Sequence, residues 1–175
     1  MQDDDQQRLF DQWLKSHRGL FFKVVRAYAF TPDDQEDLFQ EIATQVWRSV
    51  PNFRGDAAVT TWIYRVALNA AIAWTRKEWK HREGKQSLDG VDLAILQASP
   101  AADPRIEWLY AQIRELNEID RSLTLLLLDG FSYKEMASVL GITENHVGVK
   151  ISRIKAYLTT KSREEFGHGV ERNAV

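Results

Sequence analysis

The residues best suited to chemistry lie near the C-terminal end of the chain, and their types are those that contact nucleic acid. From Thr143 to Lys155, apolar residues recur at three- and four-residue intervals at Val147, Ile151 and Ile154, which predicts an amphipathic helix. The other side of this helix carries Thr143, Glu144, Asn145, His146, Lys150, Arg153 and Lys155. Arg, Lys, Asn and His side chains can reach base edges and phosphates in a major groove. The pattern therefore predicts a DNA-reading helix.

A preceding helix must position the DNA-reading helix. Its apolar stripe consists of Tyr133, Met136, Ala137 and Leu140. The stripe stops at Gly141, a residue type that suits the positive φ often needed just past a helix C-terminus. Thr143 then offers a hydroxyl to the free N–H groups of the next helix. Two short amphipathic helices joined by Gly-Ile-Thr predict a helix-turn-helix. Gly148 is open to two interpretations, because it either weakens the second helix or lets its backbone approach DNA closely.

Composition bounds the class of protein. The chain has 175 residues, of which 44% are hydrophobic and 27% charged, so it can form one or two globular domains. It has no cysteine, which excludes disulfides and thiolate metal sites and fits a reducing cytoplasm. MQDDDQQ is not a signal peptide, and the apolar run Leu123–Leu128 is too short to cross a bilayer. We expect a cytoplasmic protein without membrane insertion.

No set of residues in the sequence resembles a catalytic site. Nucleophile–base pairs, paired carboxylates and metal-ligand spacings do not stand out, so we expect no enzymatic activity, cofactor or metal. The formal net charge is −2, but the charges are segregated. Acidic residues gather early, at Asp3, Asp4, Asp5, Asp33, Asp34, Glu36, Asp37 and Glu41. Basic zones follow at Arg65, Arg76, Lys77, Lys80 and Arg82, and at Lys150, Arg153, Lys155, Lys161 and Arg163. This segregation indicates two kinds of partner, one basic and one anionic.

The elements expected along the chain are all helical. Helices are expected over 5–29, 32–49 and 58–82, with a loop at 51–56. Gly, Ser and Pro then mark an interdomain linker at 84–104, and a second helical unit begins near Pro104. The sequence therefore predicts an all-α fold with two small helical domains on a flexible linker, the second containing the helix-turn-helix.

Three polar surfaces of the first domain have more than one interpretation. The helix at 32–49 has a face that is either merely solvated or binds a partner; it carries Asp37, Gln40, Glu41, Thr44 and Arg48. In the loop, Phe53 and Arg54 could sandwich a flipped base, or Phe53 could fill the core. The third helix has a polar face that is either a phosphate track or a complement to the helix dipole. It carries Thr61, Arg65, Asn69 and Arg76.

With both halves placed, the chain resembles the extracytoplasmic-function (ECF) group of bacterial RNA polymerase sigma factors. DLFQEIATQVW and FRGDAAVTTWIYRVALNAAIAWTRK are similar to the group's region two, and LLLLDGFSYKEMASVLGITENHVGVKISRIKAYL to its region four. The implied domains are region two at 1–83, a linker at 84–104, region four at 105–166 and a tail at 167–175. The resemblance implies a protein without catalytic activity that binds core polymerase, directs it to −10/−35 promoters and aids strand opening.

The resemblance also assigns roles to the surfaces. The face of the helix at 32–49 would bind the clamp helices of the polymerase β′ subunit. A flipped −10 base would be held by Asn52, Phe53, Arg54, Gly55 and Asp56, with Thr61, Arg65, Asn69 and Arg76 on nearby DNA. The helix from Thr143 would enter the −35 major groove, while its domain sits on the β flap and the linker passes near the catalytic channel. An anti-sigma factor is a further expected partner.

Some positions depart from the family pattern, so the promoter sequence cannot be transferred. Leu68 stands where relatives often have Arg, and Ala73 where they often have Asp, which would make the DNA face of the third helix less polar. A common Gly-Thr-Val-Lys-Ser-Arg becomes Asn-His-Val-Gly-Val-Lys at 145–150. The alternative is an autonomous helix-turn-helix regulator, which would bind a palindromic operator as a dimer without polymerase. The acidic helix and the lack of an obvious dimer stripe count against it.

Overall fold

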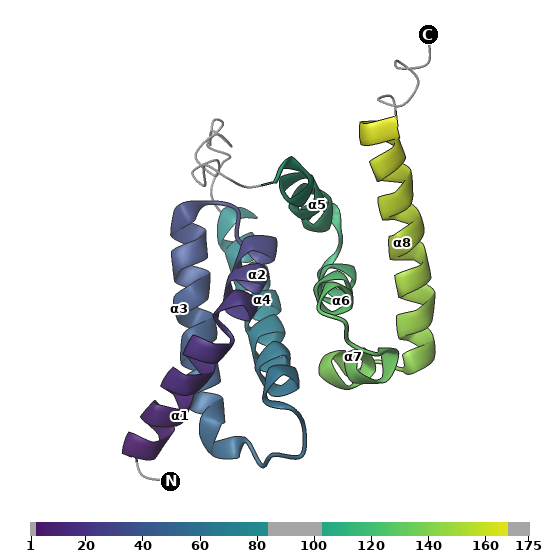
Figure 1. Cartoon of the computed structure of the whole chain (residues 1–175). Coiled ribbons are helices and arrows are strands. Elements are labelled where there is room, and N and C mark those ends of the chain that lie inside the picture. Colours follow the sequence, from purple (N-terminus) through teal and green to yellow (C-terminus); the bar gives the residue numbers. More distant parts are fainter. Residues whose placement is uncertain (1–2, 84–102, 168–175) are drawn as a thin grey trace. The chain divides into compact units, whose positions relative to one another are not determined.

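The computed structural model of the chain describes residues 3–83 and 103–167, and all its regular elements are helices (Figure 1). Most of the expected linker, at 84–102, and the tail from 168 lie outside the described residues, as do the side chains of Lys80 and Arg82. Within the described ranges no strand is present, so the all-α prediction is confirmed. None of these helices has the length and apolarity needed to cross a membrane.

The first expected helix is two helices, α1 (Asp3–Ser16) and α2 (Arg18–Tyr28), so the single helix over 5–29 was wrong. The break falls at His17, whose backbone has φ −117° and ψ 21°. The segment from Ser16 to Gly19 consists mainly of weak helix formers, which makes an interruption inexpensive there. The break lets α1 pack on the third helix, where the Gln6 side chain donates to the Trp47 carbonyl at 2.8 Å.

The helix α3 (Pro32–Ser49) has the bounds that the sequence predicts. Thr31 caps it, since its hydroxyl accepts a hydrogen bond from the Asp34 N–H at 3.1 Å, and Pro32 occupies the first turn. Its buried face carries Leu38, Ile42 and Val46. Phe39 is only half-buried, and its ring stacks on that of Phe22 with centroids 5.8 Å apart. The helix thus has one apolar side and one exposed polar side.

The short 3₁₀ helix η1 (Val50–Asn52) and a loop lead into α4 (Val59–Glu83), which runs beside α3 (Figure 1). The buried face of α4 consists of Ile63, Tyr64, Ala67, Leu68, Ala70 and Ala71. Ala73 and Leu68 were both placed on the DNA face of this helix, but only Ala73 is exposed and Leu68 is fully buried. The core of this unit therefore lies between α2, α3 and α4.

The helix α5 (Pro104–Glu115) packs with the first unit, which extends to Arg114, and the second unit begins at Glu115. Arg26 of α2 forms an ion pair with Glu107, and its guanidinium lies 4.2 Å from the ring centroid of Tyr110. The sequence placed this helix in the second domain because it follows the linker. Local periodicity gives no signal for contacts between segments on either side of the linker. The domain limits at 83/84 and 104/105 stay a prediction.

The second unit contains α6 (Glu118–Leu128), α7 (Tyr133–Leu140) and α8 (Glu144–Phe166). The turn between α7 and α8 is the one predicted: Gly141 has φ +68°, and Thr143 accepts a hydrogen bond from the His146 N–H at 3.2 Å. Met136, Val147 and Ile151 are fully buried where the helices meet. Tyr133 was expected in the apolar stripe but is exposed. The two helices with this turn form the expected helix-turn-helix (Figure 1).

Candidate nucleic-acid interface

The polar face of α3 is exposed to solvent. All five residues assigned to it are exposed: Asp37, Gln40, Glu41, Thr44 and Arg48. Two of them interact with neighbours on their own helix: the Gln45 side chain donates to the Glu41 carboxylate at 2.8 Å, and the Gln40 side chain donates to the Glu36 carboxylate at 3.5 Å. Because such intrahelical contacts are weak and exposed, the carboxylates can exchange them for a basic partner at little cost.

A groove of about 530 Å³ lies between α3 and α4. Glu41 and Arg48 line it from α3, while Asn69 lines it from α4 and Asn52 from η1. The sequence assigned the first two residues to polymerase and the other two to −10 DNA. The structure places all four around one depression, so the two predicted surfaces are adjacent. Ala73 also lines this groove, and a small side chain there leaves the groove open.

Phe53 packs into an aromatic cluster at the base of the loop. Its ring meets Trp13 edge-on at 5.2 Å between centroids and Trp62 at 5.7 Å. The Trp62 indole N–H donates to the Ser49 hydroxyl at 3.0 Å, which fixes the ring that Phe53 contacts. Of the two roles left open for Phe53, the geometry therefore favours filling the core. The rest of the loop is free, since Asn52, Arg54, Gly55 and Asp56 are all exposed.

The four residues of α4 that were assigned to DNA differ in how exposed their side chains are. Asn69 and Arg76 are exposed and Arg65 is half-buried, but Thr61 is only 8% exposed. The expectation that Thr61 faces outward was wrong, because it lies one turn from buried Tyr64 on the inward side of the helix. Leu68 is likewise a core residue, so its difference from relatives does not make the outer face less polar. Only Ala73 does so.

The outer face of α8 also differs from the predicted set at one position. Thr143, Glu144, Asn145, His146, Arg153 and Lys155 are exposed, as expected. Lys150 is instead half-buried, and its ammonium forms an ion pair with the Asp120 carboxylate of α6 at 2.8 Å. The expected outward orientation of this side chain was wrong, because a partner distant in sequence holds it against the body of the unit, and its contact with DNA stays a prediction.

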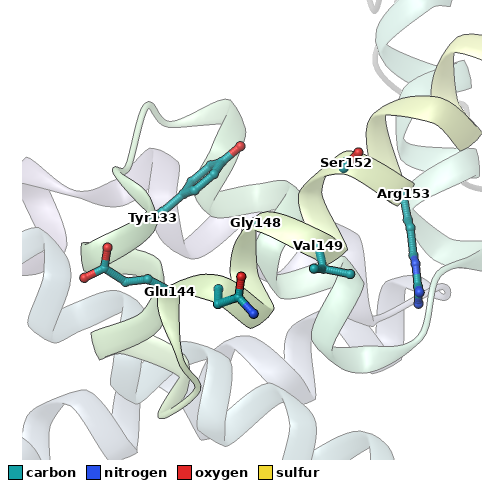
Figure 2. Close-up of a pocket in the computed structure, with 7 residues that line it drawn as sticks. Tyr133, Glu144, Gly148, Val149, Ser152 and Arg153 are labelled. Carbon is teal, nitrogen blue, oxygen red and sulfur yellow. The ribbon is translucent and has the colours of Figure 1, made fainter.

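Three exposed residues on this face were missed by the sequence: Tyr133, Val149 and Ser152. Together with Glu144, Asn145, Gly148 and Arg153 they line a shallow hollow on α8 (Figure 2). Residues 145, 149 and 152 follow each other at helical spacing opposite the buried stripe, and this spacing was the available signal. Apolar Val149 and aromatic Tyr133 did not look like surface residues.

A capping box holds the start of α7. The Ser132 hydroxyl and N–H both donate to the Glu135 carboxylate, at 2.7 and 2.8 Å, and Ser132 accepts from the Glu135 N–H. The Ser132 hydroxyl, and then its N–H, lower the pKa of Glu135 below its ordinary value. This box orients the helix that carries Tyr133.

Two family models match the chain in consecutive order. Residues 13–81 match sigma-70 region 2, and residues 106–158 match sigma-70 region 4. The ECF sigma factor SigM of Mycobacterium tuberculosis is 26% identical over 155 residues, covering 85% of this chain and 74% of the relative. The ECF sigma-E factor of Escherichia coli K12 is 26% identical over 141 residues, covering 73% of each. The chain belongs to the ECF group of the sigma-70 family.

Solved structures share the fold of this ECF sigma factor. The sigma factor RpoE of Bartonella quintana, in complex with the anti-sigma factor NepR, superposes with a TM-score of 0.72 at 19% identity, over 86% of this chain and 94% of that one. CnrH in complex with the cytosolic domain of CnrY gives a TM-score of 0.62 at 22% identity, over 88% and 87%. The region 4 model begins at residue 106, inside α5, although α5 packs with the first unit. Sequence similarity to region 4 therefore begins within α5, whereas the second compact unit begins after it.

Proposed function

We propose that this ECF sigma factor binds core RNA polymerase, directs it to promoters with specific −10 and −35 elements, and aids strand opening. The observation that carries the proposal is that each unit has its own exposed surface, and that the two surfaces differ in chemistry. Region 2 presents an exposed face containing Asp37 and Glu41, and region 4 presents an exposed face containing Asn145 and Arg153. The first surface suits a basic protein partner, and the second suits the major groove.

The α3 face is the proposed contact for the β′ clamp helices. Its carboxylates are free of buried partners, so they attract cationic side chains without a large desolvation cost. The adjacent groove between α3 and α4 then lies next to the polymerase contact. This adjacency would couple capture of core polymerase to placement of −10 DNA.

The loop after η1 and the outer side of α4 are the proposed −10 site. Asn52, Arg54 and Asp56 are exposed and offer hydrogen-bond donors and acceptors to an extruded base. Phe53 supports the loop from below through its contacts with Trp13 and Trp62. Asn69, Arg65 and Arg76 would contact the DNA backbone near the point of opening.

The N-terminal turn of α8 is the proposed −35 reader. The Thr143 cap starts the helix so that the exposed side chains of Glu144, Asn145 and His146 project from its first turn. Helix-turn-helix proteins insert this part of the second helix into the major groove. Arg153 and Lys155 lie farther along, where cations would bind phosphates.

Two further partners are proposed. Region 4 would rest on the β flap, and an anti-sigma factor would hold the chain inactive. The second proposal is supported by the fold, since the similar RpoE structure is a complex with an anti-sigma factor. The anti-sigma proposal is tested by mixing the purified chain with candidate anti-sigma domains and measuring the loss of polymerase binding.

The polymerase contact is tested by charge reversal. Asp37→Lys with Glu41→Lys should greatly reduce co-purification with core polymerase while leaving the helical circular dichroism unchanged. Asp4→Lys with Asp11→Lys is a matched control, because it reverses two exposed acids on α1 and changes net charge equally. Unchanged capture by the α3 variant would refute the proposed contact.

In vitro transcription distinguishes the proposal from an autonomous regulator. The full chain plus core polymerase should start transcripts from a subset of a promoter library, and neither component should do so alone. Tight binding of the chain to a palindromic operator as a dimer, without any effect on polymerase, would favour the alternative. That alternative is disfavoured by the region 2 match, since an autonomous regulator has no use for it.

A further inference from the structure

A hollow of about 650 Å³ opens on the exposed side of α8 around Gly148. Tyr133 of α7 lies on one side of it, and Val149 and Ser152 of α8 lie on the other (Figure 2). Tyr133 and Val149 are 41% and 43% exposed, although both are largely apolar. These two side chains therefore form an apolar part of the hollow, within the polar face proposed to read DNA.

The glycine at the floor of this hollow is not required by the fold. Gly148 does not have the positive φ that Gly55, Gly130 and Gly141 adopt. A Cβ at residue 148 would lie 3.7 Å from Cε2 of Tyr133 and 3.8 Å from Cδ2, which is ordinary van der Waals contact. Glycine within a helix is less favourable than alanine. Alanine would fit and favour the helix, so what the glycine adds is the depth of the hollow.

The surroundings of the hollow indicate what would enter it. Asn145 and Arg153 line the same hollow and are exposed, and these residue types hydrogen-bond to base edges or phosphates. Among the groups that base pairs present in the major groove, the 5-methyl of thymine is the apolar one. The apolar part of the hollow lies beside side chains that are proposed to contact DNA, and its chemistry suits that methyl group.

We propose that the recess formed by Tyr133, Gly148 and Val149 receives the 5-methyl group of one thymine in the −35 element. Val149 and the Tyr133 ring then favour a T·A pair at that position, while neighbouring polar residues bind adjacent bases. This inference rests on the proposed function of α8 as the −35 reader, and it names the residues that set one base preference.

The test uses the full chain assembled with core polymerase. Promoter duplexes randomised at the −35 element are selected by binding, and each thymine of the selected element is then replaced singly by deoxyuridine, which lacks the methyl. One replacement should weaken binding about fourfold, the factor expected for burying one methyl group. At that position, 5-methylcytosine should bind more tightly than cytosine.

Variants assign the effect to the recess. Val149→Ala should reduce the thymine-over-deoxyuridine preference to less than about twofold, and Gly148→Ala should do the same by filling the floor. Gly148→Ala should also unfold at an equal or higher temperature, which separates loss of preference from loss of folding. Thr159→Ala is the matched control, since Thr159 is another exposed β-branched residue of α8 and should retain the wild-type preference.

The outcomes separate the two proposals. If the assembled enzyme selects no −35 sequence, the proposed function fails. If it selects one but no deoxyuridine replacement matters, or if Val149→Ala keeps the full preference, the recess does not read thymine and this inference fails. An apolar side chain of a protein partner as the true occupant would give this second result.

Discussion

Lys150 of α8 and Asp120 of α6 form an ion pair of 2.8 Å between side chains that are only 22% and 20% exposed. The Asp120 carboxylate also accepts a hydrogen bond from the Asn117 side chain at 2.7 Å, and Asn117 caps α6. One carboxylate therefore joins the start of α6 to the second turn of α8. The pair therefore links α8 to α6 within the second unit.

Lys150→Ala should lower the free energy of unfolding by about 1–2 kcal/mol, because it removes a partly shielded charged hydrogen bond. Asp120→Ala should cost more, since it also removes the bond to Asn117. Urea denaturation of both single variants and the double variant should give a coupling energy of about 1 kcal/mol. Strictly additive effects would show that the pair contributes nothing.

Arg153→Ala should leave the free energy of unfolding within about 0.5 kcal/mol of wild type, because the side chain is exposed. If Arg153 binds a phosphate, the variant should reduce the slope of log K against log salt by about 1 for promoter binding. Binding titrations at several salt concentrations measure this slope. Ser162→Ala farther along α8 serves as the control and should keep it.

Phe53→Ala should lower the free energy of unfolding by about 2 kcal/mol, roughly half the cost of truncating a fully buried Phe, because the ring is half-buried against Trp13 and Trp62. Phe53→Leu should restore much of that loss. Tryptophan fluorescence during urea unfolding measures the free energy of unfolding of both variants.

Arg54→Ala supplies the comparison within the same loop. Its side chain is exposed, so stability should be unchanged while opening of −10 DNA weakens. Equal stability of Phe53→Ala and Arg54→Ala would contradict the role of Phe53 as a core residue.

The capping box makes one part of the stability depend on pH. Because the pKa of Glu135 is lowered in the folded state, its contribution is fully present above the ordinary value of 4.5 and is lost as the pH falls through the lowered pKa. Glu135→Gln should therefore be less stable than wild type at neutral pH. The difference in stability should shrink as the pH falls through the lowered pKa of Glu135. Urea midpoints between about pH 3 and pH 7 test the convergence. A difference that grows in acid would contradict the assignment.

Local chemistry made much of the fold predictable from the sequence. Thr31 followed by Pro32 sets the start of α3 through a cap and a fixed φ, and Gly141 followed by Thr143 sets the turn of the helix-turn-helix. These signals act over a few residues, so tertiary context does not alter them. The exposed face of α3 followed from periodicity for the same reason.

Packing decided the remaining features. The sequence placed Leu68 and Thr61 on an outer face and left two roles open for Phe53. It could not predict their burial, because a helix or loop face is buried only where another element lies against it. Lys150 was assigned to DNA because Asp120, thirty positions away, gives no signal in local spacing. The sequence alone determined the all-helical class, the bounds of α3, the turn of the helix-turn-helix and the family resemblance. Only the tertiary structure decided which polar side chains remain free to bind a partner, because burial and ion pairing depend on residues brought together by folding.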